Sequence, residues 1–473
     1  PMHLTPHQAQ AFERLQQFVQ DKGRQVFVLK GYAGTGKTTL AKFLLDWIEE
    51  ASIPCAPVLL ASTGRAARIL GEKTGWATNT IHGHIYALER IDAKLPDKPK
   101  ADASGQLVMN FGLKEPFPID RPYLFLIDEA SMLSHITSSG AGIARFGSGS
   151  VLNDFFSYLR PEDKVVFIGD PAQLPPVLAQ DSFSPALDEH FLATQYGRST
   201  SAATLTEVLR QAEENPILTL ASTLRRRLEA REFEGWEELL KNFRAPNIFT
   251  PYTQDIMFDR YLAKAKDQWD EGIILTHSNK QAFYLNINIR KKLSGGKYFP
   301  HPLKGEILLV SQNSYYVPLA NGDRVMLLHS EKGGIRKGIK FSKVRLRALH
   351  NGEEYETLLL QDFLFQPEAN LPPDIQQRLI IDFDQRMREK GVKRGSEPYL
   401  NAMKSDPWLN ALRAKFGYAV TCHKAQGGEW SHCFLNLSET LNLLTPEARF
   451  RWLYTAVSRA REALDIKPIF KKR

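Results

Sequence analysis

A glycine-rich segment near the start of the chain has the composition and spacing of a phosphate-binding loop. It runs Gly31-Tyr32-Ala33-Gly34-Thr35-Gly36-Lys37-Thr38, between a short apolar run and a predicted helix. Glycines let successive backbone N–H groups surround a phosphate, and the helix N-terminus adds a favourable dipole. In such a loop Lys37 would reach the β- and γ-phosphates, and the Thr38 hydroxyl would hold Mg²⁺. A chance glycine turn is the alternative, and the strand–loop–helix context disfavours it.

An acidic pair, Asp128-Glu129, follows a second apolar run from Tyr123 to Ile127. One carboxylate at that point can bind Mg²⁺, and its neighbour can orient or deprotonate an attacking water. An acidic pair alone is usually a solvated turn, but its place downstream of a phosphate-binding loop favours catalysis. We therefore predict ATP and Mg²⁺ as ligands, with Thr38 and Asp128 on the metal.

Three further side chains could act on a γ-phosphate. Gln173 lies in Gly-Asp-Pro-Ala-Gln-Leu-Pro-Pro-Val, where it could position water, although a proline-stiffened loop fits the pattern equally well. Arg210 and Arg459 could bind the charge that spreads over phosphate oxygens in the transition state. Lone arginines on helices are mostly surface residues. Arg459 has more weight, because an arginine from a second domain would link hydrolysis to domain closure.

These residues need an open parallel sheet to bring them together. Continuous apolar runs alternate with helical periods, at Val26 to Leu29, Val58 to Ala61, Tyr123 to Ile127 and Val165 to Ile168. Such runs are typical of parallel strands covered on both faces, and chemistry gathers at their carboxyl ends. A second set lies at Ile273 to Thr276, Cys433 to Leu437 and Leu464 to Ile466. The chain is therefore predicted to be α/β, with two nucleotide-binding domains in tandem.

Two stretches break the α/β pattern. Residues 84–120 alternate around Leu107 to Phe111 and indicate a β-hairpin, and residues 326–399 contain Lys343-Val344-Arg345-Leu346-Arg347 before a charged helix. The latter run indicates a strand with one basic and one apolar face. We therefore expect a first domain of residues 1–83 and 121–265, a second of 266–325 and 400–473, and inserted modules at 84–120 and 326–399.

Composition and charge narrow the protein class. The 473 residues are 43% hydrophobic, which excludes wholesale disorder, and a net charge of +8 favours polyanionic partners, though weakly. Cys55, Cys422 and Cys433 form no CxxC pair, which suits a reducing cytosol. No apolar run approaches the roughly 20 residues that span a bilayer. We therefore expect a cytoplasmic protein without membrane contact.

Taken in order, these segments resemble superfamily 1 helicases, and most closely the 5′-to-3′ branch of RecD-like, Dda-like and Pif-type enzymes. Leu4-Thr5-Pro6-His7-Gln8 is similar to the Q motif, and the phosphate loop and acidic pair to motifs I and II. The segment around Gln173 is similar to the RecD-like form of motif III. The resemblance runs from Leu4 to Arg461. It implies two RecA-like P-loop NTPase domains, with a β-hairpin inserted in the first and an SH3-like module in the second.

The resemblance also implies which residues contact nucleotide and DNA. The nucleotide set would be Gln8, on the adenine, together with Gly34, Thr35, Gly36, Lys37, Thr38, Thr39, Gly427 and Glu429. Segments similar to motifs Ia, Ib, IV and V would place Thr63, Arg65, Thr80, His82, Asn279, His423 and Lys424 on single-stranded DNA. Arg459 lies in a segment similar to motif VI. Phe111 is a candidate base-stacking residue in the hairpin, although hairpin core is the commoner role for such an aromatic.

We therefore expect a monomeric ATP-dependent DNA helicase that moves 5′ to 3′ on single-stranded DNA and unwinds tailed duplexes, with DNA repair or replication proteins as candidate partners. A DNA-stimulated translocase subunit of a larger recombination or nuclease complex is the alternative. A scaffold with a degenerate ATPase site is disfavoured by the intact Lys37, Asp128, Glu129 and Arg459. The sequence does not discriminate DNA from RNA or assign a role to residues 366–417.

Overall fold

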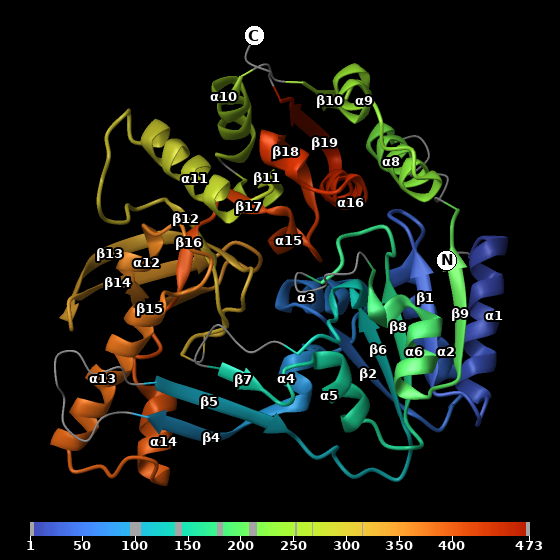
Figure 1. Ribbon diagram of the computed structural model, residues 1–473, viewed down its shortest axis with the longest axis horizontal. Helices are drawn as coiled ribbons and strands as arrows, with labels where there is room; N and C mark the ends of the chain where they lie inside the picture. Colours follow the sequence, from blue (N-terminus) through green and yellow to red (C-terminus); the bar gives the residue numbers. More distant parts are fainter. Residues whose placement is uncertain are drawn as a thin grey trace.

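A computed structural model describes residues 4–94, 106–137, 144–176, 183–207, 215–250, 253–266, 268–314 and 316–469. Within them the chain forms two parallel sheets, a separate antiparallel sheet and a hairpin-based sheet (Figure 1). In the described part of the chain, no helix combines the length and apolar character that a bilayer crossing requires.

The first parallel sheet has six strands in the order β3-β2-β6-β8-β1-β9. The strands are β1 (Val26–Gly31), β2 (Ala56–Ala61), β3 (Thr78–Thr80), β6 (Tyr123–Asp128), β8 (Lys164–Gly169) and β9 (Thr200–Leu205). Around them lie α1 (Pro6–Gln20), α2 (Lys37–Glu50), α3 (Gly64–Thr74), α4 (Ile81–Ile85), η1 (Ala130–Met132), α5 (Val151–Tyr158), η2 (Pro185–Leu187) and α6 (Glu189–Tyr196). Phe27 and Leu29 pack on the α1–α2 side, and Val26 and Val28 on the α5 side. This two-faced burial explains the continuous apolar run in β1.

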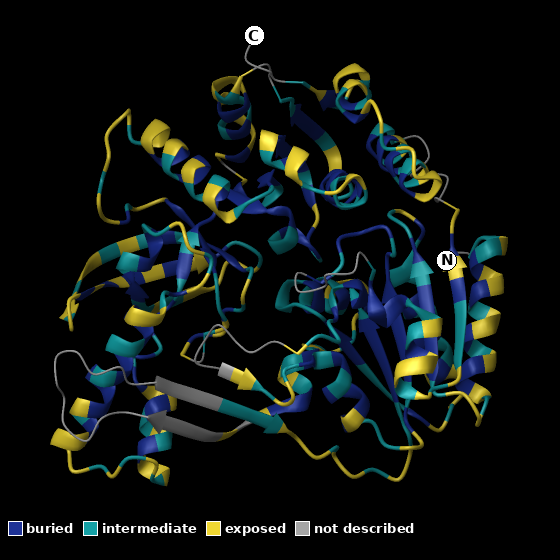
Figure 2. Ribbon diagram, in the orientation of Figure 1, coloured by how far each residue is buried: buried dark blue, intermediate teal, exposed yellow. Residues whose placement is uncertain are grey.

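The second parallel sheet has the order β10-β19-β18-β11-β17. Its strands are β10 (Ile248–Phe249), β11 (Gly272–Thr276), β17 (Ala419–Thr421), β18 (Trp430–Asn436) and β19 (Ala460–Lys467). The helices are α8 (Pro216–Ala230), α9 (Trp236–Asn242), α10 (Gln254–Ala265), η3 (Trp269–Glu271), α11 (Asn279–Leu293), α15 (Cys422–Ala425), η4 (Glu439–Leu443) and α16 (Pro446–Val457). In Figure 2 the central strands of both parallel sheets are buried, and exposed residues lie on the helices.

The sequence predicted that the first domain ends at residue 265, and the structure places this boundary earlier in the chain. Helix α8 packs against α16 and β19, and β10 pairs with β19 in the second sheet. Ile217, Leu220 and Leu224 of α8 share one buried cluster with residues of α16. Residues 216–265 therefore belong to the second domain, because their apolar faces are covered by it.

The hairpin in the first domain consists of β4 (Tyr86–Lys94) and β5 (Gln106–Leu113), which pair antiparallel. The short β7 (Ala144–Phe146) adds to β5 in parallel. The hairpin projects away from the six-stranded sheet toward the helices of the second insertion, and β5 contacts α13 there (Figure 1).

The second insertion is a five-stranded antiparallel sheet followed by helices. The strand order is β15-β14-β13-β12-β16, with β12 (Ile307–Val310), β13 (Arg324–Arg336), β14 (Ile339–Ala348), β15 (Glu354–Leu360) and β16 (Ala414–Phe416). From Ser342 to Ala348, buried and exposed residues alternate along β14. Val344 and Leu346 face inward, and the basic residues face outward as expected: Lys343, Arg345 and Arg347. The insertion spans 307–416 rather than the expected 326–399, because β12 and the three-residue β16 both pair into this sheet.

Helices α13 (Pro373–Glu389) and α14 (Glu397–Ser405) lie within the stretch 366–417, to which the sequence assigned no role, and α12 (Gln361–Leu364) directly precedes it. They bury a cluster that includes Phe383 and Tyr399. Asp384, which is 5% exposed, pairs with Arg388 and Arg394. The stretch is therefore a small helical unit with its own core, packed beside the antiparallel sheet.

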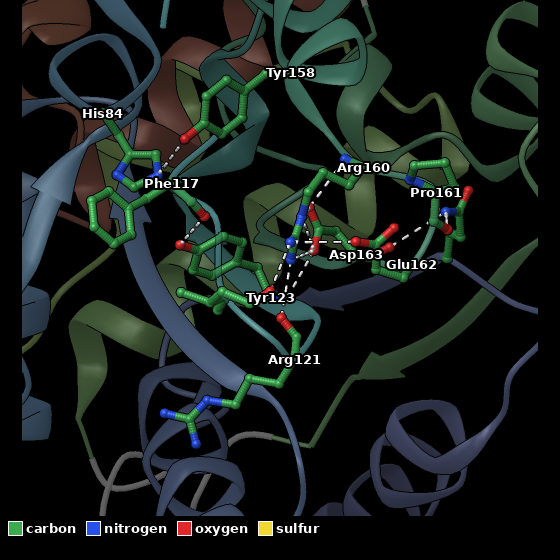
Figure 3. Close-up of polar contacts among 11 residues, drawn as sticks. His84, Phe117, Arg121, Tyr123, Tyr158, Arg160, Pro161, Glu162 and Asp163 are labelled. Atoms are coloured by element: carbon green, nitrogen blue, oxygen red, sulfur yellow. Dashed lines mark hydrogen bonds and ion pairs between the residues drawn. The ribbon is translucent and has the colours of Figure 1, made fainter. Parts of the chain in front are cut away.

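The chain that returns from β5 to β6 is fastened to the loop before β8 (Figure 3). Arg160 donates to Asp163 Oδ1 at 2.7 Å and to the carbonyl oxygen of Arg121 at 3.0 Å. Tyr123 donates its N–H to Asp163 Oδ1 at 2.8 Å and its hydroxyl to the carbonyl oxygen of Phe117 at 2.9 Å. One buried carboxylate therefore ties together the starts of two neighbouring strands.

Candidate nucleotide site and strand path

The glycine-rich segment forms a loop between β1 and α2, as its sequence predicts. Gly34 and Gly36 have φ of +77° and +81°, a left-handed conformation that favours glycine, and Gly36 caps the N-terminus of α2. Thr38 and Thr39 lie in the first turn of that helix. Lys37 Nζ donates to the carbonyl oxygen of Tyr32 at 3.1 Å, so this side chain lies across the loop.

Gln8 connects α1 to the phosphate loop. Its Nε2 donates to the carbonyl oxygen of Thr35 at 3.0 Å, and its Oε1 accepts from the N–H of Thr5 at 3.0 Å. Only 4% of Gln8 is exposed. The side chain thus orders the loop, and its expected contact with adenine stays a prediction.

The acidic pair lies at the carboxyl end of β6. Asp128 Oδ1 accepts the N–H of Glu129 at 2.8 Å, and Glu129 has a φ of +52°, unusual for a residue with a side chain. Burial raises the pKa of Asp128 and raises that of Glu129 to about 7. Arg459 and Lys37 act in the opposite direction on Glu129. The two cations therefore lie near the carboxylate that would orient water, although Arg459 comes from the second domain.

Arg459 is held rigidly just beyond the end of α16. Its Nε donates to the carbonyl oxygen of Thr455 at 3.1 Å and its Nη1 to that of Gly428 at 3.2 Å, and only 4% of the residue is exposed. Its charge acts to lower the pKa of Glu129, which belongs to the first domain, and its expected contact with the γ-phosphate stays a prediction. The other candidate arginine, Arg210, lies outside the described residues.

The segment after β8 forms hydrogen bonds with residues of the second domain. Asp170 accepts the hydroxyl of Tyr454 at 2.6 Å, and the same hydroxyl accepts the N–H of Ala33 in the phosphate loop at 2.9 Å. Leu174 donates its N–H to Thr455 Oγ1 at 3.0 Å. Gln173 is 4% exposed, and its Oε1 has no hydrogen-bond partner among the described residues. That buried carbonyl oxygen can accept from water, and the Nε2 of the same amide can donate to a phosphate oxygen.

Sequence reasoning assigned no role to Tyr454 or Thr455, although both lie in a segment it singled out. The available signal was a phenol and a hydroxyl within an otherwise apolar helical stripe, where each must find a buried partner. It also missed Arg225, whose guanidinium lies 4.0 Å from the ring centroid of Tyr32. Arg225 is on α8, so the second domain contacts the phosphate loop at two points.

The predicted nucleotide residues Gly427 and Glu429 contact α3. A Cβ on Gly427 would lie 2.8 Å from the Cβ of Ala66, and Glu429 pairs with Lys73 at 3.4 Å. Their expected contact with nucleotide stays a prediction.

Arg65 packs against a side chain of the second domain. Its guanidinium lies 4.1 Å from the ring centroid of Trp430, and burial lowers its pKa to about 10. The indole of β18 thus offers a cation–π partner at the domain interface, and the expected contact of Arg65 with single-stranded DNA stays a prediction.

Two more predicted strand-binding residues serve as helix caps. Thr63 Oγ1 accepts the N–H of Ala66 at 3.2 Å at the start of α3, and Thr80 Oγ1 accepts that of Gly83 at 3.0 Å at the start of α4. Hydroxyls at these positions order the helix termini that would face a strand. Contact with DNA stays a prediction for both residues.

A cavity of about 660 Å³ separates the base of the hairpin from the helical unit of the second insertion. Its lining includes His82, Tyr86, Phe111 and Phe146 on one side and Lys404 on the other. Phe111 stacks on Phe146 with ring centroids 4.7 Å apart, so it belongs both to the hairpin core and to the cavity wall. Aromatic faces beside cations suit single-stranded nucleic acid. Burial lowers the pKa of His82, which makes it a neutral member of this wall.

A second hollow lies over β17 in the second domain and brings together Asn279, Lys415 and Lys424. Burial lowers the pKa of Lys424, and burial with the charge of Lys424 lowers that of Lys415 to about 7. Burial, aided by His277, lowers the pKa of His423 to about 4, so this histidine is neutral at pH 7. His423 can therefore offer a strand a hydrogen bond but no ion pair.

Comparisons with known proteins match both halves of the chain. Residues 3–238 match the AAA domain family, and residues 416–466 match the UvrD-like helicase C-terminal domain family. The ATP-dependent RecD2 DNA helicase of Deinococcus radiodurans is 24% identical over 97% of this chain. The chain spans only 48% of that relative's length. The ATP-dependent DNA helicase Dda of Enterobacteria phage T4 is 23% identical, over 97% of this chain and 98% of Dda.

The fold is also similar to that of a Bacteroides Pif1 helicase solved with ADP-AlF3 and single-stranded DNA. The TM-score is 0.52 at 17% identity, with 100% of this chain and 94% of that one covered. This chain belongs to helicase superfamily 1B. As a superfamily 1B protein it has two RecA-like domains, which correspond to the two parallel sheets. Lys37 lies in the first of these domains and Arg459 in the second.

Proposed function

We propose that this superfamily 1B chain is an ATP-dependent DNA helicase that moves 5′ to 3′ on single-stranded DNA and unwinds duplexes. The observation that carries the proposal is that side chains of the second domain reach the phosphate loop and act on the acidic pair, where we place a nucleotide cleft. Lys37 and Glu129 come from the first domain and Arg459 from the second, and Tyr454 links the two. A γ-phosphate held from both sides stabilises the closed arrangement, and its loss favours opening.

Within that cleft the proposed roles follow the chemistry of phosphoryl transfer. Lys37 binds the β- and γ-phosphates, Glu129 orients the attacking water, and Arg459 stabilises charge on the transferred group. Gln173 senses the γ-phosphate by donating from its side-chain Nε2, while its Oε1, which has no partner among the described residues, accepts from the attacking water. Arg210 is proposed as a second arginine on the phosphates.

Thr38 and Asp128 would hold Mg²⁺. A hydroxyl and a carboxylate are hard oxygen donors, which suits this ion, and Mg²⁺ usually binds through one or two protein groups plus substrate phosphates. The described residues contain no group of three or more His, Cys, Asp or Glu side chains placed to bind a metal. When bound, the ion would neutralise charge on the phosphate oxygens.

For the strand, the cavity beside Phe111 and the hollow beside Lys424 provide aromatic faces and cations in both domains. Such surfaces bind the bases by stacking and the phosphates by charge. RecD2 and Dda are named as DNA helicases, and the Bacteroides Pif1 structure holds single-stranded DNA. DNA is therefore the proposed substrate, and the 5′-to-3′ direction follows from the resemblance to this branch.

Unwinding of matched 5′-tailed and 3′-tailed DNA duplexes with ATP tests the proposal. We expect strand separation of the 5′-tailed duplex alone, with blunt duplex and an ATP-free reaction as controls. Equal activity on the 3′-tailed duplex would refute the direction but leave an ATP-driven motor. DNA-stimulated ATP turnover without unwinding would favour the alternative, a translocase subunit of a larger recombination or nuclease complex. Absence of DNA-stimulated turnover would refute both.

A further inference from the structure

The first turn of α3 is enclosed by the second domain. A Cβ built on Gly427 would lie 2.8 Å from the Cβ of Ala66 and 3.3 Å from Thr63 Oγ1. On another side of the turn, a Cβ on Gly64 would lie 2.7 Å from the Cβ of Ala320, which precedes β13. Contacts this close mean that the start of α3 cannot shift without moving the neighbouring loops of the second domain.

Arg65, in that turn, shares a layer with Trp430 and the backbone of Gly428. The guanidinium lies 4.1 Å from the indole centroid. A Cβ on Gly428 would lie 2.8 Å from Arg65 Nε and 2.7 Å from Trp430 Cη2. Trp430 is 2% exposed, so the layer is sealed from solvent on the indole side. The backbone at Gly428 is therefore in direct contact with both side chains.

The same short segment holds Arg459. The carbonyl oxygen of Gly428 accepts Arg459 Nη1 at 3.2 Å, and the N–H of Trp430 donates to the carbonyl oxygen of Arg459 at 2.9 Å. Residues 428–430 are thus fixed by Arg65 from the first domain and by Arg459 from the second. Displacement of one guanidinium would be passed to the other through a single stretch of backbone.

We propose that Arg65 is a positioning residue for ATP hydrolysis, which holds residues 428–430 so that Arg459 points into the nucleotide cleft. The inference rests on the proposed function, because it takes Arg459 as the group that acts on the γ-phosphate. Arg65 directly follows Thr63 and Gly64, in the segment expected to meet the DNA strand. It therefore also connects strand binding to the nucleotide cleft through one side chain.

The test compares wild type with Arg65→Ala, Arg65→Lys and a matched control, Arg14→Ala, which removes an exposed arginine from α1. ATP turnover is measured with saturating oligothymidylate, and the Kd for oligothymidylate is measured by fluorescence anisotropy. We expect Arg65→Ala to lower kcat roughly 10- to 100-fold, as small misplacements of catalytic groups do, while the KM for ATP and the Kd change little. Arg65→Lys keeps the charge without the planar face, so part of the kcat returns. Arg14→Ala matches wild type.

A double variant, Arg65→Ala with Arg459→Ala, completes the test. If Arg65 acts through Arg459, the double variant turns over ATP no more slowly than Arg459→Ala alone. If the kcat losses of the two single variants multiply in the double variant, the inference is overturned. A wild-type kcat in Arg65→Ala would also overturn it. A weakened Kd with kcat restored at saturating oligothymidylate would identify Arg65 as a strand contact instead. If Arg65→Ala does not fold, a wild-type kcat in Arg65→Lys overturns the inference. A wild type without ATP turnover refutes the proposed function itself.

Discussion

Lys37 reaches the carbonyl oxygen of Tyr32 and acts electrostatically on both Asp128 and Glu129. Its ammonium group is therefore the charge that the phosphate loop supplies to this cleft. Because loss of one preorganised charge or donor on a reacting group is costly, we expect Lys37→Ala to lower ATP turnover about 100- to 1000-fold. The measurement is a coupled ATPase assay, with DNA affinity from anisotropy expected to stay near wild type. Wild-type turnover would remove the loop from the mechanism.

The lowered pKa of Lys415 predicts how the stability of the folded protein changes with pH. Its Nζ donates to the carbonyl oxygens of Phe363 and Gln366 at 2.6 Å and 2.9 Å, and its pKa of about 7 lies far below the usual 10.5. Between these two values the unfolded chain holds a proton that the folded one lacks, so stability rises with pH. Below pH 7 both states are protonated and the effect vanishes.

In Lys415→Met this pH dependence should be absent. We expect the stability of wild type relative to the variant to rise by at most about 1 kcal/mol per pH unit above pH 7, measured by thermal melting from pH 6 to 9.5. A difference that is flat over this range would show that Lys415 keeps an ordinary pKa.

Among the elements, the connection from β5 to β6 depends on one carboxylate. Asp163 is 1% exposed and accepts from Tyr123 N at 2.8 Å and Arg160 Nε at 3.1 Å. Asp163→Ala leaves both donors without their acceptor and should destabilise the first domain by about 3–5 kcal/mol. Glu162→Ala is the matched control, because Glu162 also pairs with Arg160 but its side chain is 52% exposed. The control should cost less than about 1 kcal/mol. Equal melting temperatures for the two variants would contradict the anchoring role.

Sequence patterns predicted some of the helices and strands but not others. Continuous apolar runs predicted β1, β6, β8 and β18, because strands covered on both faces must be apolar throughout. The stripe in α8 indicates a helix but not which sheet covers it, so the domain boundary was wrong. Three-residue strands such as β16 carry no periodic signal at all.

Within the site, the phosphate loop follows β1 and the acidic pair lies at the end of β6, as their motifs predict, and Arg459 acts electrostatically on Glu129. The resemblance predicted a strand contact for Arg65 and a nucleotide contact for Gly427. The two contacts stay predictions, but the structure also places both residues at the domain interface, which the sequence did not predict. The reason is that a packing partner such as Trp430, distant in the sequence, is set by tertiary structure and leaves no local pattern.

In the whole molecule, the closed arrangement depends on polar links between the domains. Arg68 pairs with the buried Asp323 at 2.8 Å, and Tyr454 joins Asp170 to Ala33. Tyr454→Phe removes one of the two donors to Asp170, which is 1% exposed and keeps the N–H of Ala172. A hydrogen bond to a charged group is worth about 1.5–3 kcal/mol, so we expect at least about a 10-fold loss of kcat/KM for ATP.

Domain closure in Tyr454→Phe can be followed by fluorescence transfer between dyes on Glu49→Cys of α2 and Glu238→Cys of α9, because Cys55, Cys422 and Cys433 are buried. We expect a smaller closed population than in wild type. Tyr284→Phe, which changes a 55% exposed tyrosine on α11, is the control. An unchanged closed population would assign the Tyr454 hydroxyl to local stability alone.

Each domain is built from one continuous stretch of chain, since every strand of the first parallel sheet precedes residue 206 and every strand of the second follows residue 247. During translation the front half can thus complete its sheet and phosphate loop while the ribosome is still adding the remainder. Arg459 emerges only after every strand of the first sheet. With the role proposed for Arg459, a nascent chain would bind ATP without hydrolysing it, and hydrolysis would begin only once the second domain had folded against the first.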